Sequence, residues 1–146
     1  MPAGTAPLRV LLVEDSVLLA GRLEELVRRL PGVYVVGIVD SEDEAICRIA
    51  ESRPDVLVLD LHLRRGSGFG VLRALVRLDS RPVVIVLTDC AEGQYRREVE
   101  ALGAAAFLEK SRDFDRLPNL LLKFAADKPS QDPSQSKEAP TYRPLT

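Results

Sequence analysis

Four apolar runs in this chain have, at or near their carboxyl ends, side chains that could take part in phosphoryl transfer. The polar residues in these places are Glu14 and Asp15, Asp60, Thr88 with Asp89, and Lys110. A carboxylate can attack phosphorus to form an acyl phosphate, and carboxylates in a small cleft suit Mg²⁺. An ammonium group and a hydroxyl can bind the phosphoryl oxygens. If these residues meet, we expect a phosphoryl-transfer site in which Asp60 is the nucleophile.

The elements that must position these residues alternate along the chain. Apolar runs at 8–13, 33–39, 56–61, 83–87 and 104–108 predict five strands, and the first four lack polar alternation, as do strands of a parallel sheet. Helical spacing is expected up to Pro31, from Ser41 to before Pro54, and over 71–76 before Pro82. Two further helices are expected over 91–102 and from about Asp115.

This alternation predicts an α/β fold, a doubly wound five-stranded parallel sheet with five helices. Strand order 2-1-3-4-5 is the flavodoxin-like arrangement for five such units, and its ligands bind beyond the carboxyl ends of the strands. The acidic pair, Asp60, Thr88 and Lys110 then converge in one crevice. Any one of them alone is more commonly a turn or cap residue, but four neighbouring strand ends carrying such side chains favour a site.

Composition narrows the class of protein. The 146 residues suit one domain, and 46% are apolar. The net charge of −2 and the scattered arginines give no basic surface for nucleic acid. The chain shows no secretory signal and no membrane-length apolar run, so we expect a cytoplasmic location. Cys47 and Cys90 are expected to be reduced thiols. The divisions expected are an extension over 1–7, the domain over 8–126 and a disordered Pro/Ser-rich tail over 127–146.

On these residues the chain resembles the receiver domain of two-component response regulators, over about residues 8–125. The segments that carry the resemblance are VLLVED at 10–15, VLVLDLHL at 56–63, GSGFGVL at 66–72, VVIVLT at 83–88 and GAAAFLEK at 103–110. The resemblance implies a stand-alone phosphoprotein of phosphorelay signal transduction. Its phosphoryl donor would be a sensor histidine kinase or phosphotransfer protein, its output an unnamed downstream protein, and a homodimer is allowed.

The resemblance also assigns roles to individual residues. Asp60 is the phosphoacceptor, Asp15 and Asp60 bind Mg²⁺ directly with the backbone carbonyl of His62, and Glu14 binds it through water. Lys110 and Thr88 contact the phosphoryl group. Thr88 and Phe107 form the switch, which alters the surface of the fourth helix, fifth strand and fifth helix.

Some positions depart from the family pattern and leave alternatives. Asp89 stands where a small residue is common, and His62, Asp89 and Cys90 are candidate modulators of phosphoryl lifetime. Gly66, Gly68 and Gly70 do not complete a dinucleotide fingerprint and indicate a loop that enters a helix.

One alternative function is a receiver-like interaction module that works without phosphorylation. Another is a hydrolase of the haloacid-dehalogenase type. That reading is disfavoured because His62 replaces the second aspartate and the chain has no room for a cap domain.

Overall fold

The five expected strands form one parallel sheet in the expected order. The computed structural model describes residues 6–89 and 92–128. Its strands are β1 (Leu8–Val13), β2 (Val33–Val39), β3 (Val56–Leu59), β4 (Val83–Thr88) and β5 (Ala106–Glu109). They lie in the order β2-β1-β3-β4-β5, with parallel pairing between all neighbours. The predicted fold class is therefore confirmed.

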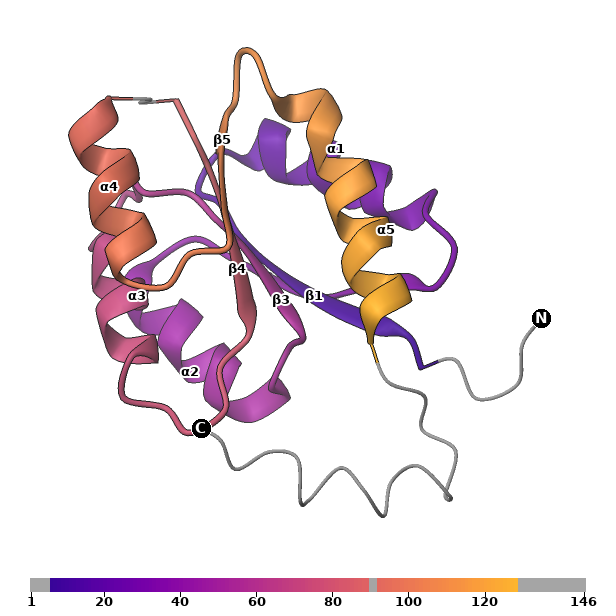
Figure 1. Cartoon of the computed structure of the whole chain (residues 1–146), viewed down its shortest axis with the longest axis horizontal. Coiled ribbons are helices and arrows are strands. Elements are labelled where there is room, and N and C mark those ends of the chain that lie inside the picture. The colour runs from indigo at the N-terminus through magenta and orange to yellow at the C-terminus, as the bar shows by residue number, and fades with distance from the viewer. Residues whose placement is uncertain (1–5, 90–91, 129–146) are drawn as a thin grey trace.

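Helices cover both faces of the sheet. Helices α1 (Val17–Arg28) and α5 (Leu117–Asp127) lie on one face, and α2 (Glu42–Ser52), α3 (Gly68–Leu75) and α4 (Gly93–Ala101) lie on the other (Figure 1). A 3-10 turn (Phe114–Arg116) precedes α5. Among the described residues, no helix combines the length and the apolar character needed to cross a membrane.

The core has two halves, one on each face of the sheet. Successive strand residues point to opposite faces, so Leu11 packs toward α2 and α3 while Leu12 packs toward α1 and α5. Leu57 and Val58 on β3 divide in the same way. Both sets are buried, and this explains why the strand sequences are continuously apolar.

Several element boundaries differ from those expected. β3 ends at Leu59, because the chain turns after Asp60 and the Leu61 carbonyl accepts from the Gly68 N–H. β5 begins at Ala106 instead of residue 104, because the Ala104 N–H still bonds to the Val99 carbonyl of α4. The end of β3 at Leu59 places Asp60 in the loop that directly follows this strand.

The ends of the last two helices also differ. Helix α4 begins at Gly93, and Ala91 lies outside the described residues. Helix α5 continues to Asp127, and the Lys128 ammonium group lies 2.7 Å from Oδ2 of Asp55. Residues 1–5 and 129–146, which make up most of the expected extension and tail, lie outside the described residues.

Candidate functional site

Three carboxylates meet at the carboxyl edge of the sheet. Glu14 and Asp15 follow β1, and Asp60 follows the neighbouring strand β3, where its N–H bonds to the Val13 carbonyl at 3.1 Å. One oxygen from each carboxylate lies within 4.8 Å of the others. Glu14 and Asp60 are only 4% and 5% exposed. Buried carboxylates this close require a proton or a cation between them, and an all-oxygen set suits Mg²⁺.

Lys110 supplies a positive charge to this cluster. It directly follows β5, and its N–H donates to the Thr88 carbonyl at 2.8 Å. Its Nζ lies 3.0 Å from Oδ2 of Asp60 and 3.0 Å from Oε1 of Glu14. The ammonium group therefore lies between two buried carboxylates, where it could also bind the oxygens of a phosphoryl group.

Burial and pairing change the acidity of these groups in different ways. Burial raises the pKa of Glu14 above its usual 4.5, and the hydrogen bond from Lys110 offsets part of that rise. For Lys110, burial acts to lower the pKa, but the hydrogen bonds to Asp60 and Glu14 outweigh it and raise the pKa above 10.5. The ammonium form of Lys110 is thus secured at neutral pH, and Glu14 takes up a proton at a higher pH than an exposed glutamate does.

Thr88 in β4 and Phe107 in β5 are two further buried residues of the expected site. Thr88 is fully buried, and its Oγ1 has no hydrogen-bond partner within the described parts of the chain. Phe107 is buried on the face that α4 covers, and the guanidinium carbon of Arg96 lies 4.6 Å from the centre of its ring. Arg96 belongs to α4, so this helix contacts the aromatic side chain expected to act in the switch.

Most of the expected site residues line one open cavity of about 480 Å³. The lining includes the three carboxylates, Lys110, Asp89 and His62, together with Ser16. Asp89 and His62 are exposed, whereas Thr88 and Phe107 are buried and do not line the cavity. Cys90, the third expected modulator, lies outside the described residues.

Three contacts at this site were not expected from sequence. The Ser16 N–H donates to Oε2 of Glu14 at 3.0 Å, and the Arg64 guanidinium lies 3.4 Å from the Asp15 carbonyl. The ring of Tyr95, on α4, lies edge-on to His62 with 6.0 Å between ring centres. Ser16 had a signal, since it stands at the start of a helix. The contacts of Arg64 and Tyr95 join segments that are distant in sequence, so no pattern in the neighbouring residues predicts them.

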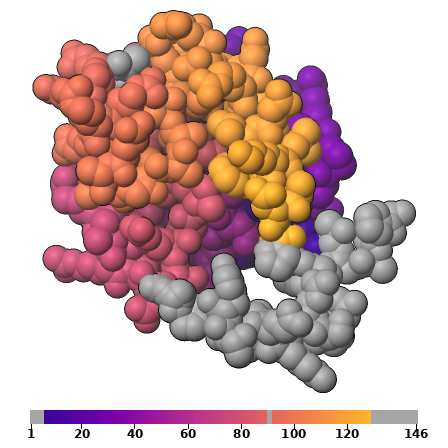
Figure 2. Space-filling view, in the orientation of Figure 1, coloured from indigo at the N-terminus to yellow at the C-terminus, as the bar shows by residue number. Residues whose placement is uncertain are grey.

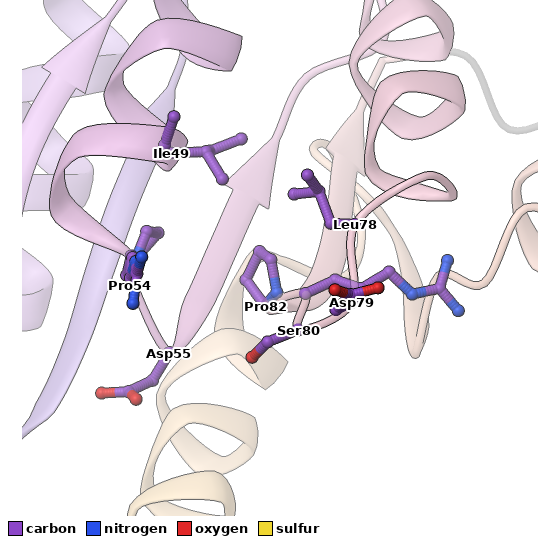
Figure 3. Close-up of a pocket in the computed structure, with 10 residues that line it drawn as sticks. Ile49, Pro54, Asp55, Leu78, Asp79, Ser80 and Pro82 are labelled. Atoms are coloured by element: carbon purple, nitrogen blue, oxygen red, sulfur yellow. The ribbon is translucent and has the colours of Figure 1, made fainter. Parts of the chain in front are cut away.

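A second and larger cavity lies at the opposite edge of the sheet. Its volume is about 560 Å³, and it contains none of the expected site residues. Figure 3 shows its wall, formed by the segments that lead into β3 and β4, with Pro54, Asp55 and Pro82 at the rim. Acidic, basic and apolar side chains all line it, so it offers no converging chemistry comparable with the acidic cavity.

Known proteins share both the sequence and the fold. The sequence-family model of the response regulator receiver domain matches residues 10–122 of this chain. The sensory transduction protein LytT of Bacillus cereus is 30% identical over 85% of this chain and 50% of its own length. A protein-glutamate methylesterase/protein-glutamine glutaminase of Myxococcus xanthus is 38% identical over 69% of this chain and 29% of its own length. The chain thus spans half or less of these curated relatives.

A solved structure gives the same result for the fold. A signal receiver domain from Vibrio parahaemolyticus is 31% identical and has a TM-score of 0.75. The match covers 83% of this chain and 92% of that one. The segment that matches the family model includes most of the five-stranded parallel sheet and its helices. This chain therefore belongs to the response regulator receiver domain family.

Proposed function

We propose that Asp60 accepts a phosphoryl group from the phosphohistidine of a sensor histidine kinase or phosphotransfer protein. The observation that carries the proposal is the contact of the Lys110 ammonium group with Asp60 and Glu14, at 3.0 Å each, beside a third carboxylate. A structural ion pair would need one carboxylate. The additional carboxylates give the oxygen-rich surroundings of a divalent metal ion.

Mg²⁺ is the cofactor that this donor set fits. Asp15, Asp60 and the backbone carbonyl of His62 would hold the ion directly, and Glu14 would hold it through water. When bound, Mg²⁺ offsets the negative charge that builds up on the phosphoryl oxygens. The open cavity leaves room for the waters that Mg²⁺ retains.

The chain's own residues orient the acceptor. The His62 N–H donates to Oδ1 of Asp60 at 3.2 Å, and Lys110 binds Oδ2. This pair of contacts restricts the orientation of the Asp60 carboxylate at the wall of the cavity. A carboxylate oxygen forms the new O–P bond as the P–N bond of the phosphohistidine breaks, and the imidazole leaves with its electron pair. Lys110 binds a phosphoryl oxygen throughout this transfer.

The unpaired hydroxyl of Thr88 connects this step to the rest of the fold. A phosphoryl group on Asp60 would supply an acceptor for Thr88 Oγ1, which has none among the described residues. Movement of Thr88 toward it would free space beside Phe107, which contacts α4 through Arg96. Because Val99 is the one buried residue of α4, that helix can shift at small cost.

The surface that would change is broad. Helices α4 and α5 form one continuous surface in the space-filling view (Figure 2). We propose that this α4–β5–α5 surface carries the signal to a downstream protein. A two-state element biased by a local change of charge is the usual form of such a switch.

The test is labelling by a small acyl-phosphate donor with Mg²⁺, followed by intact-mass measurement. One phosphoryl group should be added to the wild-type chain and none to Asp60→Ala. Chelating Mg²⁺ should also prevent labelling. Labelling that survives Asp60→Ala would refute the assignment. No labelling by acyl-phosphate or phosphohistidine donors would favour a module that acts without phosphorylation.

A further inference from the structure

The glycine-rich segment after Asp60 encloses a carboxylate that the proposed chemistry does not use. Glu42 lies in the first turn of α2, and its Oε1 accepts from the Ser67 N–H at 3.0 Å. Its own N–H donates to the Arg65 carbonyl, also at 3.0 Å. Two bonds therefore join the start of α2 to residues 65 and 67, which precede α3.

The glycines in this segment leave room for that carboxylate. A methyl group on Gly66, whose φ is +79°, would lie 2.6 Å from Oε1 of Glu42, and one on Gly70 would meet the same carboxylate. Gly68 instead makes room for the backbone of Asp60 and Leu61. The spacing of the three glycines thus reflects close approach by Glu42 on one side and by the Asp60 loop on the other.

The loop of residues 61–67, which Glu42 holds against α2, also contacts the Asp60 carboxylate. His62 and Ser67 are paired across the loop in an antiparallel bridge, and the Gly68 N–H donates to the Leu61 carbonyl at 2.9 Å. The same turn presents the His62 N–H to Asp60. A continuous set of contacts therefore runs from Glu42 through Ser67 and His62 to the Asp60 carboxylate.

From these contacts we infer that Glu42 is a positioning residue for the acidic site. It anchors the 61–67 loop to α2 and so holds the His62 backbone in the orientation that Mg²⁺ binding and Asp60 require. This inference rests on the proposed Mg²⁺ site. Glu42 makes its hydrogen bonds to residues 65 and 67 and not to Asp60, and it does not line the acidic cavity.

The test is a titration of the full chain with Mg²⁺ in the absence of a phosphodonor. Binding is monitored through the amide chemical shifts of residues 60–67 in nitrogen-15 NMR spectra. Glu42→Ala should raise the Mg²⁺ dissociation constant about tenfold, as groups that orient metal ligands do. Glu42→Gln should restore binding, because its amide oxygen still accepts from the Ser67 N–H. The matched control is Asp43→Ala, which removes the same charge from an exposed position in the same helical turn.

A second variant separates positioning from a general loss of stability. Gly70→Ala adds a methyl group against the Glu42 carboxylate but suits a helix, so it should weaken Mg²⁺ binding in the wild-type background. Glu42→Ala removes the three atoms that lie nearest to the added methyl group, so no further weakening should follow in that background. Non-additivity of this kind identifies direct contact between the two positions.

Hydrogen exchange at the Ser67 amide tests its hydrogen bond to Glu42 independently of the metal. In Mg²⁺-free protein, the Ser67 amide should exchange faster in Glu42→Ala than in wild type or Asp43→Ala. If wild type binds no Mg²⁺ but Ser67 exchange responds as described, the proposed metal site is refuted, whereas the anchoring of the 61–67 loop by Glu42 is supported. The inference would be overturned by unchanged Ser67 exchange in Glu42→Ala, or by equal Mg²⁺ dissociation constants in Glu42→Ala and Asp43→Ala. It would also be overturned if Glu42→Gln bound Mg²⁺ as weakly as Glu42→Ala.

Discussion

The Nζ of Lys110 lies 3.0 Å from Oδ2 of Asp60, a contact between side chains that follow β5 and β3. β4 lies between these two strands, so the contact spans the carboxyl edge of the sheet. Both side chains are largely buried, with 13% and 5% exposed. Among the described residues, Lys110 is the one cation that forms ion pairs with the buried carboxylates of Glu14 and Asp60. The buried carboxylates therefore depend on it whenever no metal ion is bound.

Removing Lys110 should destabilise the protein strongly at neutral pH. Lys110→Ala leaves Glu14 and Asp60 buried without a counter-charge, and breaking a buried pair in this way costs about 3 kcal/mol. Urea unfolding at pH 7 measures the loss, and added Mg²⁺ should recover part of it. Lys123→Ala, at an exposed position on α5, is the control and should change stability by less than about 0.5 kcal/mol. Equal effects of the two substitutions would contradict the proposed dependence.

The same variant should respond to pH. Burial raises the pKa of Glu14 above 4.5, so folding favours its protonated form. That favourable contribution is present below 4.5 and is lost as pH rises through the folded pKa. In Lys110→Ala the cost of the unpaired Glu14 should therefore shrink as pH falls toward 4.5, which urea unfolding across this range would detect.

Thr88→Val should separate stability from signalling. Valine has nearly the shape of threonine and removes a buried hydroxyl that has no partner in the described residues. We expect the free energy of unfolding to rise by about 1 kcal/mol. Phosphoryl uptake at Asp60 should continue by intact mass, but the phosphorylation-dependent shift of the Phe107 ring signals in NMR should be lost. Thr88→Ser, which keeps the hydroxyl, should retain that shift; its loss there would point to packing alone.

Asp89 is exposed and lines the acidic cavity, so its charge should oppose anionic phosphodonors. Asp89→Asn should raise the initial rate of labelling by a small acyl phosphate about threefold at low ionic strength. The gain should fade at high salt, because exposed charges are screened. Asp79→Asn, at the cavity on the opposite edge, removes the same charge and should leave the rate unchanged. An equal gain in both variants would indicate an effect of net charge.

Asp113 closes the loop that carries Lys110. Its Oδ2 accepts from the Glu109 N–H at 2.9 Å, and its own N–H donates to the Glu109 carbonyl at 2.7 Å. The first of these bonds lowers the pKa of Asp113 below 3.8. The ionised carboxylate therefore stabilises the fold above 3.8, and this contribution is lost as pH falls through the folded pKa.

Asp113→Ala should accordingly be less stable than wild type at pH 7, and the difference should shrink below pH 3.8. Urea unfolding at a series of pH values provides the measurement. The matched control is Asp115→Ala, which removes the same charge from an exposed neighbouring position in the 3-10 turn. A difference between wild type and Asp113→Ala that stays constant with pH would rule out the carboxylate bond as its cause.

Local patterns were sufficient to predict the sheet and the strand ends at which the three carboxylates and Lys110 meet. β1 and β2 lie where the apolar runs predicted them, and the Ser41 side chain caps α2 by accepting from the Glu44 N–H. The predicted strand order brings the residues after β1, β3 and β5 to one edge of the sheet, and the structure confirms that order. This succeeds because burial on both faces leaves a strong signature in each strand.

Boundaries and loop contacts were less predictable. The end of β3 and the start of β5 depend on which carbonyl accepts each N–H in a turn, and several choices differ little in local energy. The glycines after Asp60 indicated a loop, but nothing near them in sequence identified Glu42 as the group they accommodate.

The sequence by itself therefore determined the fold class, the strand order and the set of chemically capable residues. Those properties follow from hydrophobic burial and from alternation of strands and helices, which are repeated along the chain. Only the tertiary structure decided that Lys110 lies between Glu14 and Asp60, and that Thr88 Oγ1 is buried without a partner in the described residues. Pairing and desolvation depend on distances between side chains far apart in sequence, and these distances exist only after the sheet has formed.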